Sequence, residues 1–198
     1  MQRQIRAIIP VFLVFFSSLS IWLAACNSID ERYFERLDSL DNRLDTITAM
    51  LQVDGQTIER RKELIEGHIR LVQLHYNDTF SPEFGTFLSK YKGVGKAYKK
   101  FTADYSNCLT ELESLKKQAA DLRQSVEAGT ISKDAFKQYY ATETADGIAL
   151  YNRSKNIIDP VHSVEPDYQR ISRLVHEKLS EKAKENPDLD SALKDLAQ

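Results

Sequence analysis

Cys26 is the residue whose surroundings point most clearly to a chemical reaction. It follows Leu23-Ala24-Ala25 at the end of residues 7–25, a stretch without a single charged side chain. Residues 1–6 carry two arginines and no acid. A basic start, an apolar run and small residues form the layout of an export signal. The alanines suit a peptidase that needs slim side chains beside its cut, and the Cys26 thiol is the nucleophile that a lipid transfer requires.

The quartet Leu23-Ala24-Ala25-Cys26 resembles the lipobox of bacterial lipoproteins. The resemblance covers the first 26 residues. It implies removal of residues 1–25 as a signal peptide and a thioether-linked diacylglyceryl group on Cys26. It also implies a further acylation site, for palmitate or a similar acid, at the new amino terminus. Two or three acyl chains anchor a protein stably because each buried methylene contributes about 0.8 kcal/mol, whereas one chain binds only marginally.

An uncleaved transmembrane anchor is the alternative interpretation of this segment. Residues 7–25 approach the length of about 20 residues that a spanning helix needs. Pro10 and the serines Ser17, Ser18 and Ser20 weaken that interpretation. A transmembrane anchor also has no need of a lipobox at its end.

Asn27 lies where the best-known Gram-negative lipoproteins carry an aspartate that retains them in the inner membrane. The resemblance therefore implies the outer membrane, on its periplasmic or surface face. We divide the chain into a signal peptide at 1–25, a lipidated tether at 26–29 and one helical domain at 30–198. A length of 198 residues is enough for one domain and hardly for two.

The composition indicates a folded, helical and mildly acidic domain. Apolar residues make up 42% and charged residues 28% of the chain, the balance of a folded protein. Only 7 glycines and 5 prolines supply turns, which favours a few long elements. Without residues 1–25 the chain has 25 basic and 29 acidic side chains, a formal charge of −4. This charge gives no electrostatic reason to expect nucleic-acid binding.

The apolar pattern predicts a first long helix over residues 30–76. Between Leu37 and Leu51, apolar residues recur in steps of three and four, the spacing of a coiled coil. The pattern fails at Asp54-Gly55 and then resumes as a wider stripe. We therefore expect a kink or break near Gly55.

The second helix, expected at 82–128, has the most regular pattern. Ser81 is a capping residue, and Pro82 fits the first helical position, where its missing N–H costs nothing. Gly129 supplies a left-handed stop. Thirteen apolar residues step by three and four between these ends: Phe84, Phe87, Tyr91, Val94, Tyr98, Phe101, Tyr105, Cys108, Leu112, Leu115, Ala119, Leu122 and Val126.

Two further helices are expected at 133–158 and 166–185. Asp159-Pro160 marks the end of the first, and Pro166 marks the start of the second. A short helical turn is expected after Pro187. No segment alternates with a period of two, so we predict no sheet.

The connections at 77–81 and 129–131 are short and require antiparallel neighbours. The predicted fold class is therefore all-α, an elongated antiparallel bundle of coiled-coil-like helices. In this bundle, the end that contains residues 30–53 and 105–131 lies nearer the membrane.

A basic stretch lies within the second helix, and no acidic residue follows it before Asp104. It consists of Lys90, Lys92, Lys96, Lys99 and Lys100. One interpretation is contact with anionic headgroups, a polysaccharide or the acidic patch of a partner. The other is a solvated helix face whose lysine stems cover the apolar seam. The predicted hairpin places the stretch far from the anchor, which argues against lipid contact.

Gly93-Val94-Gly95-Lys96 lacks the spacing and the hydroxyl residue of a phosphate loop. The two glycines indicate a close helix approach or a flexible point. His68 and His75 lie about 10 Å apart along one helix, too far to share a metal ion. We expect no metal site and no cofactor except the lipid on Cys26.

Cys108 is expected to be a small buried apolar residue; the alternative is an exposed thiol that links two copies. No catalytic residue is predicted, since no serine or cysteine has the local sequence of an activated nucleophile. The leading hypothesis is a non-enzymatic envelope lipoprotein whose helical domain is an interaction scaffold for an envelope protein or for itself. The alternative is a bundle that binds a lipid or other apolar ligand in the aromatic run from Phe84 to Tyr105. Residues 27–198 resemble no family that we identify.

Overall fold

The computed structural model describes residues 31–76 and 81–196. The predicted signal peptide, lipobox and tether lie outside these ranges. The described residues form five helices: α2 (Glu31–Met50), α3 (Gly55–His75), α4 (Pro82–Glu127), α5 (Lys133–Ala183) and α6 (Pro187–Leu196). Neither described range contains a strand, so the predicted all-α class is confirmed. None of these five helices combines the length and apolarity needed to cross a bilayer.

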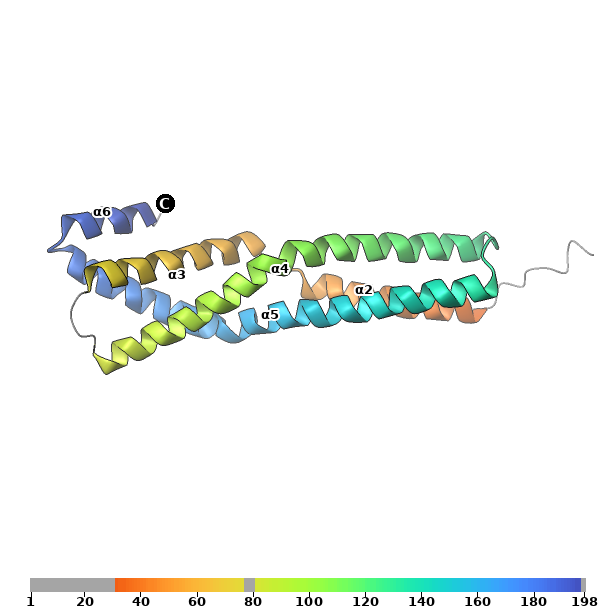
Figure 1. Ribbon diagram of the computed structural model, residues 1–198, viewed down its shortest axis with the longest axis horizontal. Helices are drawn as coiled ribbons and strands as arrows, with labels where there is room; N and C mark the ends of the chain where they lie inside the picture. The colour runs from red at the N-terminus through yellow and green to blue at the C-terminus, as the bar shows by residue number, and fades with distance from the viewer. Residues whose placement is uncertain (1–30, 77–80, 197–198) are drawn as a thin grey trace, which may run out of the picture.

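The helices form a long, narrow bundle (Figure 1). Helices α4 and α5 run antiparallel along its length, and α2 and α3 each cover a different half of that pair. Helix α6 folds back onto α3 and α5 at one end. We call α2 with residues 105–127 and 133–157 the α2 half. The α3 half comprises α3, α6 and residues 82–104 and 158–183.

The predicted break near Gly55 separates α2 from α3. The N–H of Thr57 donates a hydrogen bond to Asp54 Oδ1 at 3.0 Å, so Asp54 caps the start of α3. A Cβ at Gly55 would lie 2.8 Å from Cε1 of Tyr105, which is closer than packed atoms approach. Glycine therefore allows the Tyr105 ring to lie against the first turn of α3.

Tyr105 also satisfies backbone groups that the break leaves without helical partners. Its hydroxyl lies 2.9 Å from the carbonyl oxygen of Leu51 and 3.0 Å from that of Val53, and donates to them. Carbonyls at a helix end need such partners when they are not hydrated. The break is thus held by a side chain of α4, which ties the junction of the two halves to the helix that spans both.

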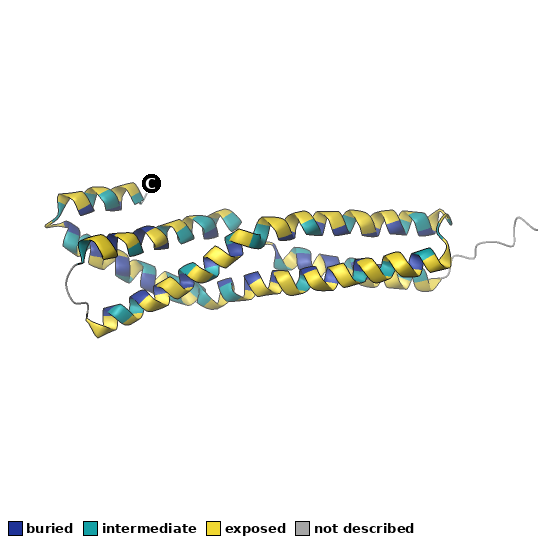
Figure 2. Ribbon diagram, in the orientation of Figure 1, coloured by how far each residue is buried: buried dark blue, intermediate teal, exposed yellow. Residues whose placement is uncertain are grey.

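Helix α4 begins and ends as predicted. Ser81 Oγ accepts a hydrogen bond from the N–H of Phe84 at 3.2 Å, and Gly129 has a φ of 63°. Eleven of the thirteen predicted seam residues are buried, and Phe87 and Tyr105 are half-buried. The buried sides of the helices face one another along the whole bundle (Figure 2). The seam is therefore the core of this chain and not an exposed coiled-coil surface.

The predicted division of residues 133–185 into two helices is wrong. Helix α5 continues through both Pro160 and Pro166, and it changes direction about halfway along its length (Figure 1). A proline inside a helix removes one backbone hydrogen bond and costs about 3 kcal/mol. Ile157, Ile158 and Val161 are buried across this segment. Their burial offsets that cost, so the helix bends and does not end.

The expected turn after Pro187 is the helix α6. Leu189 and Leu193 are buried beneath it, and the side-chain oxygen of Asn186 caps it by accepting from the N–H of Leu189 at 3.2 Å. A Cβ at Gly67 of α3 would lie 2.2 Å from a methyl carbon of Leu196. The glycine thus allows α6 to pack closely on α3, so that the α3 half has one more helix than the α2 half.

Candidate functional site

The lysines of the predicted basic patch all lie on the part of α4 that belongs to the α3 half, and all five are exposed. At 100° per residue, Lys92, Lys96, Lys99 and Lys100 fall within an arc of about 100° on the side opposite the buried seam. Lys90 falls outside this arc. The structure therefore brings four of the five lysines together, and we call these four the lysine face.

The lysine face has no ion pair with any described residue, in contrast to Arg123 and Lys116 of the α2 half. There Arg123 bridges to Asp38 at 2.6 Å and to Asp41 at 2.7 Å. Lys116 likewise reaches Asp45 at 3.3 Å. These bridges join α4 to α2, whereas the four ammonium groups of the lysine face remain open to an external partner.

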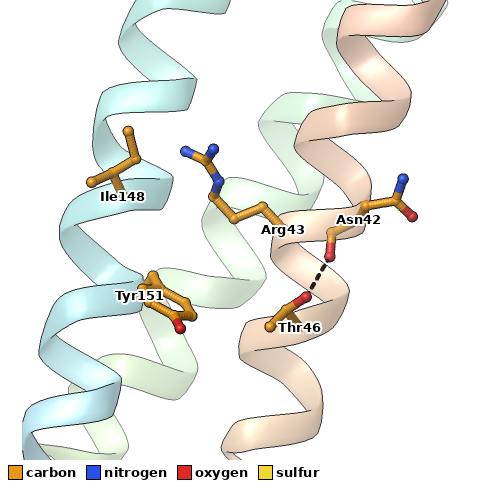
Figure 3. A pocket seen from close by; sticks show the side chains of 5 residues that line it. All are labelled: Asn42, Arg43, Thr46, Ile148 and Tyr151. Atoms are coloured by element: carbon orange, nitrogen blue, oxygen red, sulfur yellow. Dashed lines mark hydrogen bonds between the residues drawn. The ribbon is translucent and has the colours of Figure 1, made fainter.

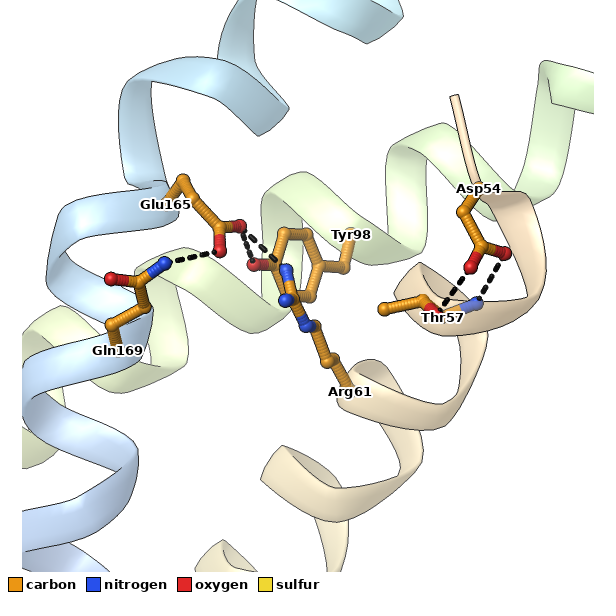
Figure 4. Close-up of polar contacts among 6 residues, drawn as sticks. All are labelled: Asp54, Thr57, Arg61, Tyr98, Glu165 and Gln169. Atoms are coloured by element: carbon orange, nitrogen blue, oxygen red, sulfur yellow. Dashed lines mark hydrogen bonds and ion pairs between the residues drawn. The ribbon is translucent and has the colours of Figure 1, made fainter. Parts of the chain in front are cut away.

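Inside the α3 half, Glu165 of α5 joins three helices (Figure 4). Its Oε2 accepts hydrogen bonds from Arg61 Nη1 of α3 at 2.7 Å and from the Tyr98 hydroxyl of α4 at 3.1 Å. Its Oε1 accepts from Gln169 Nε2 at 3.1 Å. The guanidinium of Arg61 also lies over the ring of Tyr168, 4.7 Å from its centre. We call these five residues the Glu165 cluster.

The electrostatics of the Glu165 cluster suit a structural role. Burial, and then the charge of Glu165, raise the pKa of Tyr98 above its ordinary value. The Tyr98 hydroxyl therefore remains a neutral donor. Burial is the largest influence and opposes the charge of Arg61, but Glu165, Tyr98 and Tyr168 together outweigh it, so the pKa of Arg61 is raised. The cluster fixes the register of α3, α4 and α5 through charge-assisted hydrogen bonds.

A second polar group lies further along the same half. His68 is 1% exposed, and its Nδ1 lies 3.0 Å from the hydroxyl of Tyr91, which is 3.2 Å from Ser172 Oγ. The ring of His176 lies 5.6 Å from that of His68. Nε2 of His68 is buried without a hydrogen-bond partner among the described residues. Burial, and then His176, lower the pKa of His68 from 6.5 to about 4, so the ring is neutral at pH 7.

A groove lies between α2 and α5 in the other half (Figure 3). It has a volume of about 430 Å³ and is lined by Asn42, Arg43, Thr46, Ile148 and Tyr151. The Arg43 side chain extends across it toward Ile148, which is 45% exposed. Nη1 of Arg43 has no hydrogen-bond partner among the described residues. The groove thus combines an apolar wall with a cationic group.

A further groove of about 460 Å³ marks the break between α2 and α3. Phe101, Tyr105 and Leu109 of α4 line its floor together with residues 53–56. The aromatic seam itself is filled by protein, since Tyr91, Tyr98 and Phe101 are fully buried. The aromatic run from Phe84 to Tyr105 therefore packs mainly against this chain.

The structure places the other sequence candidates as follows. Cys108 is fully buried and unbonded to another cysteine, and burial raises the pKa of its thiol. This confirms the prediction of a small buried residue. Among residues 31–76 and 81–196, no three His, Cys, Asp or Glu side chains gather into a cation site. The absence of a metal and of catalysis stays a prediction, as does lipidation of Cys26.

The Glu165 cluster and the His68 group were not found from the sequence. Arg61 follows the buried Ile58 by three residues, which is a core-facing spacing and a usable signal. Glu165 gave no such signal because it lies in the segment that was expected to be a loop. In comparisons with known proteins, no family model, no curated protein and no solved structure matches this chain.

Proposed function

We propose that this protein is a lipid-anchored envelope lipoprotein whose helical bundle presents an interaction surface at a distance from the membrane. The observation that carries the proposal is the position of the lysine face in the α3 half, whereas α2 begins at Glu31 in the other half. If Cys26 carries lipid, a tether of a few residues holds the start of α2 at the bilayer surface.

The length of α4 sets the height of this surface. From Glu127 back to Lys96 the helix rises by about 46 Å, at 1.5 Å per residue. Charges at that height lie several Debye lengths, of about 8–10 Å each, from the lipid headgroups. With the bundle axis upright on the membrane, the lysine face lies beyond the electrostatic reach of that membrane, which favours a protein partner over anionic lipid.

The apolar surfaces of the bundle support a partner of modest affinity. The seam of α4 is buried in the core, so residues 31–76 and 81–196 do not expose a long apolar stripe to drive obligate assembly. The exterior instead offers charges and shallow grooves. Such a surface is suited to an adaptor that binds and releases its partner.

The test is fractionation and crosslinking in intact cells of the native organism. Wild-type protein is expected in the membrane fraction, and Cys26→Ser in the soluble fraction. An amine-reactive crosslinker that enters the periplasm is expected to join the wild type into discrete larger complexes, with fewer complexes for Cys26→Ser. If Cys26→Ser fractionates with the membrane as the wild type does, the proposed lipid anchor is overturned. If both strains yield only monomer, the proposed interaction is overturned.

A second candidate function is the binding of a lipid or another apolar ligand. The groove between α2 and α5 favours it, because Arg43 offers a cation beside the apolar Ile148 and Tyr151. An anionic amphiphile has the matching chemistry. Native mass spectrometry of protein purified from its own membrane is expected to show a bound small molecule that Arg43→Met loses. A spectrum of the bare chain would exclude this function.

A further inference from the structure

We infer that the lysine face of α4 docks an amphipathic α-helix of an envelope protein, a helix that carries acidic side chains three and four residues apart. This inference rests on the proposed function and names the chemistry of its partner. All four lysines are exposed, and none has an ion pair with a described residue. The nearest acid further along α4, Asp104, lies 3.9 Å from Arg153 and faces that side chain instead.

The spacing of the lysines matches that of a helical ligand. Lys92, Lys96 and Lys100 follow one another at intervals of about 6 Å along the axis of α4. Carboxylates four residues apart on a second helix repeat at the same interval. Complementary charges across an interface steer encounter and fix the register of the two partners. A helix that crosses α4 at a shallow angle therefore places several carboxylates against several ammonium groups.

The shape of the same side of α4 distinguishes a helix from a flexible polyanion. Gly85, Ser89 and Gly93 follow at steps of four on the lysine side. A Cβ at Gly85 or at Gly93 would meet nothing within 4 Å, so internal packing does not require a glycine at either position. Each exposed helical glycine nevertheless costs about 1 kcal/mol relative to alanine. Small residues at this spacing leave a groove into which the ridge of another helix fits.

The lysine stems complete the groove. A lysine side chain presents apolar methylenes beside its charged end. At 100° per residue, Lys92 and Lys96 lie on one side of the row of small residues and Lys90 lies on the other, so these stems offer apolar contact to a helix lying between them. A flexible polyanion uses the charges but gains nothing from the groove. The combination of charges and groove therefore favours the helix.

A second copy of this chain is a poorer occupant. Its acidic helices are α2 and α6. Asp38 and Asp45 of α2 already pair with Arg123 and Lys116, and Asp190 of α6 pairs with Lys194. Helix α2 also lies in the opposite half of the bundle from the lysine face. Two copies anchored side by side on one membrane would therefore hold these surfaces about 40 Å apart in height, given the rise of a helix.

The experiment measures binding of defined probes to the full lipidated protein in neutral detergent. The first probe is a synthetic helical peptide with glutamates on one face, three and four residues apart, and alanines between them. The second has the same composition in an order that scatters the glutamates around the helix. The third is polyphosphate. The ordered peptide is expected to bind about tenfold more tightly than the scattered one, because only one register of charges fits.

Two variants and their matched controls locate the site. Lys96→Glu with Lys100→Glu is expected to weaken binding of the ordered peptide at least about tenfold, because attraction becomes repulsion. Lys117→Glu with Lys155→Glu is the control, a reversal of two exposed lysines in the α2 half that makes the same change in net charge. Ser89→Trp fills the groove without altering charge, and Ser114→Trp is its exposed counterpart in the α2 half. Ser89→Trp is expected to abolish peptide binding, and Ser114→Trp to leave it unchanged.

Each contrary outcome has a defined meaning. Equal binding of the ordered and scattered peptides, or binding of polyphosphate that Ser89→Trp leaves intact while neither peptide binds, would overturn the helix in favour of a polyanion. Failure of all three probes would overturn the inference outright. The proposed function is tested separately, since complexes that still form in intact cells with Lys96→Glu and Lys100→Glu would leave the interaction in place and remove only the lysine face.

Discussion

The α2 half and the α3 half use different charged contacts to join their helices. In the α2 half, charged groups bridge helices on the outside, as Arg123 does to Asp38 and Asp41. In the α3 half, a charge pair between Arg61 and Glu165 lies between the helices and only its edges reach solvent. Surface ion pairs contribute about 0–1 kcal/mol each to stability, so they do not determine how the helices of the α2 half pack.

The two cores also differ in chemistry. Aliphatic side chains fill most of both halves, but the α3 half also buries two tyrosines, two phenylalanines and His68. Tyr91 and Tyr98 are fully buried with hydroxyls bonded to Ser172 and Glu165, respectively. Buried hydroxyls demand partners in fixed places, while aliphatic side chains accept many arrangements. The α3 half is therefore the half whose geometry is specified by directional contacts.

A binding surface that depends on a register of charges is best placed on the half that directional contacts hold rigid. A half that is fixed by directional contacts holds the lysine face in one orientation relative to the bundle axis, which preserves a charge register. The α2 half needs only length and cohesion.

Truncating the core of the α2 half is expected to have the largest effect. Ile47→Ala empties a fully buried site and is expected to lower the free energy of unfolding by about 2–5 kcal/mol. Urea unfolding followed by circular dichroism measures it, with the exposed Ser39→Ala as control. A loss below about 1 kcal/mol would show that the α2 half is loosely packed.

Acid is expected to weaken the α3 half through His68. Its pKa is about 4 in the folded protein and 6.5 in the unfolded chain, so the unfolded chain binds the proton first as the pH falls. Stability is complete above pH 6.5 and is expected to fall by about 3 kcal/mol in total as the pH drops through this window toward 4. His68→Leu is expected to remove this part of the pH dependence.

The difference between wild type and His68→Leu isolates His68 from other groups that titrate in acid. Ile47→Ala provides the comparison from the α2 half, because it lowers stability without removing a titrating group. Unfolding curves at several pH values between 4 and 7 measure all three proteins. Parallel pH profiles of wild type and His68→Leu would refute the assignment.

Disrupting the Glu165 cluster is expected to cost less. Arg61 and Glu165 are each 29% exposed, so their pairing is only partly screened by water. A double-mutant cycle with Arg61→Met and Glu165→Gln is expected to give a coupling energy of about 1–2 kcal/mol. The same cycle with Arg123→Met and Asp38→Asn in the α2 half is expected to give less than about 0.5 kcal/mol. Equal couplings would erase this distinction between the halves.

The sequence predicts what is local and regular in this fold. The seam of α4, its cap at Ser81 and its stop at Gly129 all follow from patterns within one helix. The break near Gly55 was readable for the same reason, because the heptad spacing fails there. The sequence does not show which side chain bonds the free carbonyl groups at the break. Tyr105 does so, but it is distant in the chain and its spacing predicted only a seam residue.

At Pro160 and Pro166, tertiary packing outweighs the local preference of proline for a helix end. Each proline favours a helix end, and burial of the residues around them outweighs that preference. The same error concealed Glu165, which a loop would have left in solvent. The sequence predicted the basic stretch, but it could not predict that the lysine face has no ion pair, because ion pairing depends on which helices lie opposite.

Gly93 and Gly95 of α4 are expected to give the smallest effects, of opposite kinds. Gly93→Ala adds a methyl group in open space and is expected to stabilise the helix by up to about 1 kcal/mol. Gly95→Ala places its Cβ 3.1 Å from Cγ2 of Ile65, so crowding against α3 is expected to cancel that gain or reverse it. Thermal unfolding of each single variant measures the effects, which a double variant would conceal. If Gly93→Ala gains stability yet binds the ordered acidic peptide more weakly, the glycine serves a partner and not the fold; if it loses stability, packing on this side of α4 is tighter than the structure indicates.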